Sequence, residues 1–127
     1  MTNQIGFDGG LTCAMQCTDL ARSVAWYEDT LGFSLLYKVD EMGWCELKSP
    51  VDKVALGLSE VENPEVKGGA TLTFGVSDID SARAGLEAKH IAFDGETLTI
   101  PKMVKLATFY DPDGNKLMFY QDLSAQS

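Results

Sequence analysis

The sequence is short of the features on which several functions depend. Only 10 of its 127 residues are Lys or Arg, against 19 Asp or Glu, so the formal net charge is −9. A nucleic-acid-binding protein needs a basic stripe, and none is present, so we expect no nucleic-acid partner. No apolar run approaches the roughly 20 residues of a membrane helix. Residues 1–10 lack the basic start and apolar core of a signal peptide, so we expect neither membrane association nor export.

Cysteine is also scarce. Cys13, Cys17 and Cys45 make an odd number, and no C-x-x-C pair occurs. This usage is typical of free, buried thiols in a reducing compartment, so we expect a cytoplasmic protein. No paired histidine is available to activate Cys13 or Cys17 as a nucleophile. Glycine-rich phosphate loops are missing, since the Gly-Gly pairs precede strand-like runs.

The acidic charge has two interpretations. It can serve solubility alone, or it can attract a cationic ligand. The sequence does not choose between them.

A repeat is the clearest positive signal. Residues 12–20 read TCAMQCTDL and residues 71–79 read TLTFGVSDI, with Asp19 and Asp78 at the same place in each copy. Both are strand-like runs that end in a Ser/Thr-Asp helix start, so we expect two similar modules. Gly32 and His90 fall where the two helices should end, near residues 30 and 89.

Hydrophobic alternation and turn residues place the remaining elements. A tight hairpin turn is expected at residues 111–115, where Pro112 and Gly114 suit the backbone angles. Residues 95–103 look irregular because Pro101 interrupts them. The predicted strands are residues 11–18, 33–39, 42–48, 54–59, 71–76, 91–94, 104–110 and 116–121.

Each module is therefore βαβββ. We place them at about residues 10–60 and 70–122, with a linker at about 61–69, in a single domain that spans 1–127. The predicted fold is α+β: two tandem βαβββ modules form a curved, open-barrel mixed sheet with the helices outside and a cavity on the concave side.

Four motifs follow one another along the chain: Thr18-Asp19-Leu20, Trp26-Tyr27 before Leu31-Gly32-Phe33, Val76-Ser77-Asp78-Ile79, and residues 109–115 (FYDPDGN). Together with the repeat, these motifs resemble the vicinal oxygen chelate superfamily, which includes glyoxalase I, extradiol dioxygenases, fosfomycin-resistance enzymes and bleomycin-resistance proteins. The resemblance covers residues 11–122 and implies the paired βαβββ fold. It does not fix the function, because such folds host many chemistries.

The resemblance also implies where a metal would bind. Members with a metal centre place His, Glu or Gln on the first and fourth strands of each module, at positions that match Thr12, Leu56, Thr71 and Met118 here. A catalytic divalent ion needs oxygen or imidazole donors at about 2.0–2.3 Å. Leucine cannot coordinate, threonine is a poor donor, and methionine sulfur suits soft ions. His90, the only histidine, falls at a helix end, so we expect no metal and no cofactor.

We expect the apolar face of the first strand, with Cys13, Met15 and Cys17, to pack under a helix and the opposite face to line the cavity. Trp44 is either a stacking platform for a planar ligand or a hydrophobic wall. Trp26 and Tyr27 lie on a helix and suit core or dimer packing. The predicted ligand-binding residues are Thr12, Gln16, Trp44, Glu46, Leu56, Thr71, Thr73, Met118 and Tyr120.

Two functions remain open. The first is a metal-independent glyoxalase/bleomycin-resistance-like homodimer that binds a small molecule, aromatic or cationic, in the cavity. The alternative is a glyoxalase-like lyase, isomerase or dioxygenase with an unusual or metal-dependent site. Such an enzyme could use Glu46 as general base and Tyr110 or Tyr120 as acid, if they converge on one substrate. A regulatory domain without a ligand is a third possibility.

Overall fold

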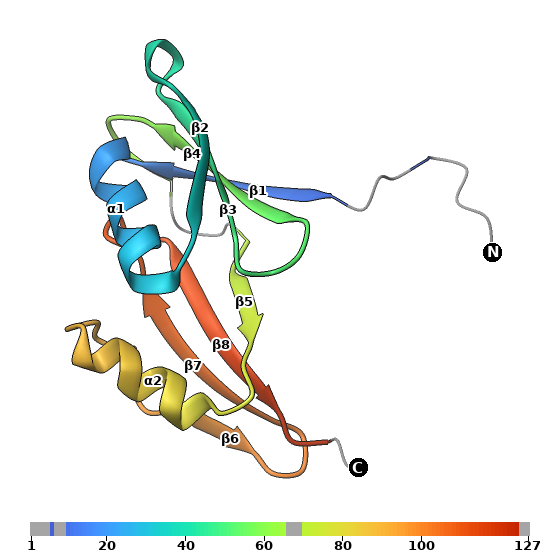
Figure 1. The fold of residues 1–127 in the computed structure, drawn as a ribbon. Coiled ribbons are helices and arrows are strands. Elements are labelled where there is room, and N and C mark those ends of the chain that lie inside the picture. The colour runs from blue at the N-terminus through green and yellow to red at the C-terminus, as the bar shows by residue number, and fades with distance from the viewer. Residues whose placement is uncertain (1–5, 7–9, 66–69, 125–127) are drawn as a thin grey trace. The chain divides into compact units, whose positions relative to one another are not determined.

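The structure is a computed structural model that describes residues 6, 10–65 and 70–124. The chain divides into two compact units, Met1–Glu65 (unit 1) and Val66–Ser127 (unit 2). Each unit contains one helix and one four-stranded sheet in the order βαβββ (Figure 1). The α+β prediction of two tandem βαβββ modules is confirmed. Residues 66–69 of the predicted linker lie outside the described residues.

Unit 1 has the strand order β1-β4-β3-β2. The outer strand β1 runs parallel to β4, and the other neighbours are antiparallel. Residues 40–42, of which Met42 was predicted as strand, form a short 3-10 turn. The elements are β1 (Leu11–Cys17), α1 (Leu20–Leu31), β2 (Ser34–Val39), η1 (Asp40–Met42), β3 (Trp44–Lys48) and β4 (Val54–Glu60).

Unit 2 repeats this plan with the order β5-β8-β7-β6. Strand β5 is parallel to β8, and the other pairs are antiparallel. Its elements are β5 (Leu72–Gly75), α2 (Ile79–Ala88), β6 (Leu98–Ile100), β7 (Val104–Tyr110) and β8 (Lys116–Asp122).

The second strand of unit 2 corrects the sequence prediction. No strand forms at residues 91–94, where only Phe93 makes an isolated bridge to Phe109. Gly95 adopts a φ of 75° and turns the chain. Arg83 holds this turn by donating to the Gly95 carbonyl at 2.8 Å. The strand forms later, at Leu98–Ile100, and Pro101 follows its end instead of interrupting it.

Both helices start in the same way. Asp19 and Asp78 are the N-caps, and each carboxylate accepts from the backbone N–H three residues on. In each unit the first N–H of the helix also donates to a side chain of the sheet. Leu20 N donates to Glu60 Oε2 of β4 at 2.9 Å, and Ile79 N donates to the Gln121 amide oxygen of β8 at 2.8 Å. These contacts tie each helix to its sheet because they satisfy backbone donors that a helix leaves free.

The core of each unit lies between the helix and one face of the sheet. In unit 1 it includes Tyr27 of α1 and Leu47 of β3, both fully buried. In unit 2 the rings of Phe109 and Phe119 pack 4.9 Å apart. Burying one such side chain contributes about 1.5–3 kcal/mol. The opposite face of each sheet carries less buried side chains and is therefore where a site can form.

The hairpin at residues 111–115 forms as predicted. Gly114 has a φ of 93°. The buried Asp111 carboxylate accepts from Asn115 N at 2.8 Å and from Asn115 Nδ2 at 2.8 Å. These bonds fix the turn and thus the register of β8 against β7.

Within the described ranges, no helix is both long enough and apolar enough to span a membrane.

Candidate functional site

The open face of the unit 1 sheet is the face opposite the one that packs against helix α1. Because neighbouring strands pair residue by residue, side chains fall into rows across this face. One row contains Ala14, Gly57, Glu46 and Tyr37, since these positions face each other in the β1–β4, β4–β3 and β3–β2 pairs. Trp44 belongs to the next row, paired with Ser59. Polar and aromatic groups thus gather at the middle of the sheet.

The indole of Trp44 lies over Gly57, in the space that a Cβ atom would occupy. A Cβ atom added at Gly57 would lie 2.2 Å from Cη2 of the indole, far inside contact distance. Glycine is therefore required on β4 for the ring to rest there. The indole is half-buried, so one part of it packs on the sheet and another remains accessible.

Hydrogen bonds hold this indole in place. Trp44 Nε1 donates to Tyr37 Oη at 3.0 Å, and Tyr37 Oη donates to Glu46 Oε2 at 2.9 Å. The three side chains therefore form one chain of donors and acceptors across β2 and β3. We call Trp44, Tyr37, Glu46 and Gly57 the indole network.

Tyr37 was not predicted to have a role. Its position depends on a break in the β2–β3 register between Leu35 and Tyr37, which makes Tyr37 face Glu46. Such a bulge adds one residue to a strand and turns its side chains. Strict alternation along residues 33–39 does not show this bulge, so no sequence signal placed Tyr37 opposite Glu46.

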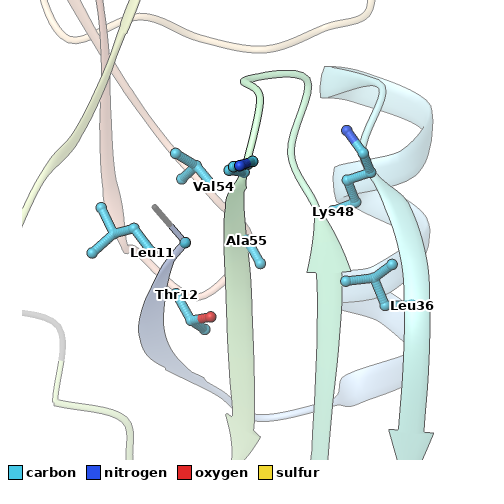
Figure 2. Close-up of a pocket in the computed structure, with 8 residues that line it drawn as sticks. Leu11, Thr12, Leu36, Lys48, Val54 and Ala55 are labelled. Atoms are coloured by element: carbon cyan, nitrogen blue, oxygen red, sulfur yellow. The ribbon is translucent and has the colours of Figure 1, made fainter. Parts of the chain in front are cut away.

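An open hollow of about 520 Å³ lies at one end of the unit 1 sheet (Figure 2). Three of its lining residues, Thr12, Lys48 and Ala55, form the row next to that of Glu46 and Gly57 on the open face. Lys48 lies two residues beyond Glu46 on β3, and Ala55 lies two residues before Gly57 on β4. Side chains from β1, β4, β3 and β2 contribute, as Figure 2 shows. The lining residues are Gly10, Leu11, Thr12, Leu36, Lys48, Lys53, Val54 and Ala55.

The predicted ligand residues of β1 separate into two environments. Thr12 lines the hollow. The side-chain oxygen of Gln16 accepts from the Glu65 backbone N–H at 2.7 Å, so it holds the chain that leaves β4. Of the two predicted ligand-binding residues on β1, Thr12 is therefore the one that lines the hollow.

Leu56 lies in the core and not on the open face, where it was expected. It is 1% exposed and pairs with the buried Leu47 and the half-buried Cys13. The reason is a difference between the hairpins: Lys48 faces Ala55, whereas Tyr110 faces Lys116, so the first hairpin encloses one residue more. Leu56 and Met118 each lie six residues after the proline of their hairpin, Pro50 or Pro112, and this equal spacing suggested that they are equivalent. The extra residue in the first hairpin shifts the equivalence by one position, which reverses the face.

The position that corresponds to Met118 is Gly57. Ala14 pairs with Gly57 and Thr73 pairs with Met118, and Ala14 and Thr73 are equivalent in the repeat. The position in unit 1 where the resemblance implies a metal ligand thus has no side chain, and the Trp44 indole covers it.

The donor set does not fit a divalent metal centre. The four positions, as corrected, hold Thr12, Gly57, Thr71 and Met118. They offer two hydroxyl groups and a thioether, whereas a divalent catalytic ion takes imidazole, carboxylate or thiolate ligands. Across residues 10–65 and 70–124, no group of three or more His, Cys, Asp or Glu is placed to hold a metal ion.

The open face of unit 2 has a similar arrangement. Met118 pairs with Thr73, and Tyr120 pairs with Gly75. A Cβ at Gly75 would lie 2.9 Å from the Tyr120 hydroxyl, so this ring also lies over a glycine. Thr71 precedes β5, and its carbonyl accepts from Thr73 Oγ1 at 3.4 Å. Ligand contacts of these four residues remain predictions.

Tyr110, predicted as a possible acid, is paired with a carboxylate. Its hydroxyl donates to Asp94 Oδ2 at 2.5 Å. This hydrogen bond is the main cause that raises the pKa of the Tyr110 phenol above its ordinary value, because it favours the protonated form. Glu46 has a phenol partner within its own unit, and that partner is Tyr37.

The chain is similar to solved structures over most of its length. A member of the glyoxalase/bleomycin resistance protein/dioxygenase superfamily from Sphaerobacter thermophilus has 19% identity and a TM-score of 0.74, covering 89% of this chain and 96% of its own. TnmS3, an antibiotic binding protein from a Streptomyces species, has 24% identity and a TM-score of 0.71, with coverages of 87% and 93%. Lactoylglutathione lyase from Agrobacterium tumefaciens has 19% identity and a TM-score of 0.72, with coverages of 87% and 91%.

At these identities the structures support the fold and not an activity. A search of curated protein sequences gave no significant match. The family model described as Glyoxalase/Bleomycin resistance protein/Dioxygenase superfamily matches residues 11–119, which is most of the chain. With the two βαβββ units and their shared helix starts, this match establishes that the chain belongs to the glyoxalase/bleomycin resistance protein/dioxygenase superfamily.

Proposed function

We propose that this chain is a metal-independent binding protein for a small aromatic molecule, which it holds on the open face of the unit 1 sheet. The observation that carries the proposal is the Trp44 indole, fixed over Gly57 at the position where the resemblance implies a metal ligand. A superfamily structure similar to this one is named an antibiotic binding protein, which supports a binding role.

The indole network has the properties of a binding platform. Tyr37 and Glu46 hold the ring through bonds of 3.0 and 2.9 Å, so little side-chain freedom remains to be lost when a ligand stacks on it. Aromatic pairs gain about 0.5–1.5 kcal/mol beyond their buried area. The hollow beside it, about 520 Å³, has the volume of a typical small-molecule site.

Fluorescence of Trp44 tests the proposal directly. The variant Trp26→Phe leaves Trp44 as the single tryptophan of the chain. After treatment with EDTA, this protein is titrated with a panel of planar anionic, neutral and cationic compounds. We expect at least one compound to change Trp44 fluorescence saturably, with the same affinity before and after metal removal.

Gly57→Ala supplies the structural control. The added Cβ would overlap the indole, so Trp44 must leave the backbone of β4. We expect binding to weaken about tenfold and the free energy of unfolding to fall by about 1–3 kcal/mol. Gly85→Ala is matched, because a Cβ there meets nothing within 4 Å. The proposal would be contradicted if no compound of the panel bound saturably, or if binding required added metal.

The Tyr37–Glu46 contact favours one alternative function, an enzyme. A carboxylate within 2.9 Å of a phenol is the residue pair that proton transfer requires. The alternative is therefore a glyoxalase-like lyase, isomerase or dioxygenase whose unusual site uses Glu46 as base. Mass spectrometry of each bound compound after incubation distinguishes the two functions. An enzyme would convert a compound, and Glu46→Gln would keep its binding and abolish the conversion.

We also propose a homodimer and a cytoplasmic location. All three cysteines are free in the structure, which suits a reducing compartment. Burial, as the main cause, raises the pKa of the Cys45 thiol and keeps it in its unreactive form.

A further inference from the structure

We infer that the ligand carries an anionic group, and that Lys48 and Lys53 bind this group in the hollow while the apolar part of the ligand extends toward Trp44. The inference rests on the proposed function, because it assigns the second end of the same ligand. It differs from the cationic ligand that the net charge of the whole chain allows.

Among the described residues, the charged side chains that line the hollow are both positive. Lys48 and Lys53 contribute two ammonium groups, and no Asp or Glu of residues 10–65 lines it. The other lining residues are apolar or carry a hydroxyl. In a chain with a net charge of −9, this is a local reversal of sign. A ligand group bound beside these two lysines interacts with them more strongly than with carboxylates beyond about 10 Å, which salt screens. Glu46 is nearer, two residues from Lys48 on β3, and its Oε2 accepts from the Tyr37 hydroxyl at 2.9 Å.

Neither lysine has a carboxylate partner among the described residues. Lys48 Nζ makes only a long contact, 3.5 Å, to the Ser49 carbonyl. Two other lysines differ, since Lys38 pairs with Asp40 at 3.5 Å and Lys105 pairs with Asp80 at 3.4 Å. The two ammonium groups of the hollow are thus available to an external anion.

The backbone around the hollow is fixed. Leu11 N donates to the Lys53 carbonyl at 2.9 Å, which ties the β3–β4 turn to the start of β1. Leu36 is the extra residue of the β2 bulge, and it lines the hollow as an additional apolar side chain. The site therefore combines two positive groups with an apolar wall, which suits an amphiphilic anion.

The distance between the two parts suits one small molecule. Lys48 and Trp44 lie on the same strand, four residues apart, which corresponds to about 13 Å along the backbone. Both side chains can reach toward the intervening row, so a ligand with one or two fused rings can span them. The ligand class is an aromatic carboxylate, sulfonate or phosphate.

Two fluorescent probes with the same rings test the charge. Anilinonaphthalene sulfonate is anionic, and phenylnaphthylamine lacks the sulfonate. We expect the full-length protein to bind the anionic probe at least tenfold more tightly at low ionic strength. Added salt should weaken the binding of the anionic probe and leave the neutral probe unaffected.

Paired substitutions assign the effect to the hollow. Lys48→Gln with Lys53→Gln should weaken the anionic probe about tenfold and leave the neutral probe unchanged. The matched control is Lys116→Gln with Lys102→Gln in unit 2, which changes the net charge equally. The control also matches the local structure of each site. Lys116, like Lys48, is an exposed lysine on a strand. Lys102, like Lys53, is a turn lysine with positive φ, 65° against 62°. We expect this control to bind both probes like the parent protein.

The outcomes separate the two proposals. Equal binding of the two probes, or equal effects of the two double variants, would overturn the anionic ligand and leave a binding protein in place. If the anionic probe fails to bind while a neutral or cationic compound quenches Trp44, the inference is also wrong and the proposed function stands. If no compound of any charge affects Trp44, the proposed function itself fails. Circular dichroism of each variant checks that it is folded.

Discussion

A single contact decides how Tyr110 can act. Its hydroxyl donates to Asp94 at 2.5 Å, and this bond is the main cause that raises the pKa of the phenol. A phenol with a raised pKa gives up its proton less readily. Tyr110 is therefore less suited to act as a general acid than its residue type suggested. Tyr37 also donates to a carboxylate, that of Glu46, at 2.9 Å.

We predict that Asp94→Asn lowers the pKa of Tyr110 toward its ordinary value near ~10. Because the folded state favours the protonated phenol, any stabilisation by this bond is present below that ordinary pKa. It is lost as the pH rises through the higher, folded-state pKa. The ultraviolet absorbance of tyrosinate follows the titration.

Tyr110→Phe identifies which of the four tyrosines gives the shifted step. An Asp94→Asn protein with the same tyrosine titration as the parent would show that the bond does not set the pKa.

At the residue scale, side-chain chemistry predicted Trp44 and Glu46 as members of the candidate site, and their ligand contacts remain to be tested. Chemistry could not find Tyr37, because its position depends on a bulge that the pattern of residues 33–39 does not show. Leu56 was misplaced for a similar reason: the two hairpins enclose different numbers of residues, and that difference is visible only in the strand register.

At the scale of elements, the two helix ends differ in an instructive way. Gly32 follows α1 with a φ of 77°, and His90 follows α2 with a φ of 68°. Both positions are left-handed, which glycine adopts freely and other residues adopt at a cost of about 1–2 kcal/mol. The repeat therefore preserves the shape of the helix end but not the residue that suits it.

His90→Gly should raise the free energy of unfolding by about 1 kcal/mol, because glycine relieves this backbone strain. Urea denaturation measures the change. His90→Ala is the control, since it removes the imidazole but keeps a Cβ, and we expect no comparable gain. An equal gain from alanine would mean that the imidazole, and not the backbone, is unfavourable.

Strong local signals explain which elements could be predicted. The Asp19 and Asp78 caps and the hairpin at residues 111–115 depend on short-range hydrogen bonds, and all three form as expected. Strand β6 has only three residues, and Gly95 and Pro101 lie close to its two ends, so its sequence resembles a loop. Its pairing with β7 makes it a strand, and pairing between distant residues is what a local pattern does not contain.

At the scale of the whole molecule, the repeat extends to details that the sequence did not reveal. Each unit ends its last strand with a side chain that accepts from the first N–H of its helix, and each places an aromatic ring over a glycine. The net charge of the whole chain is a poor guide to the charge around the hollow. The net value of −9 was compatible with solubility alone or with a cationic ligand, whereas the hollow is lined by two lysines.

We predict a homodimer in solution, with a mass by light scattering of twice the 13.8 kDa of the chain. The outer strand β6 and the turn after it expose Leu98 by 58%, Ile100 by 37% and Met103 by 58%. An apolar edge strand of this kind invites pairing with a second chain. Leu98→Lys should shift the protein toward the monomer, whereas Met42→Lys, at another exposed apolar position, should not. A monomeric parent protein would contradict the prediction.

The ring of Trp44 over Gly57 also constrains how this protein can evolve. A donor side chain at position 57 needs a Cβ, and that atom would lie 2.2 Å from the indole. A mutational path that introduces a metal ligand there must therefore displace or replace the Trp44 indole, and it loses the binding platform in doing so. A donor side chain at position 57 and an indole resting over β4 thus exclude each other, so the protein can gain one only by giving up the other.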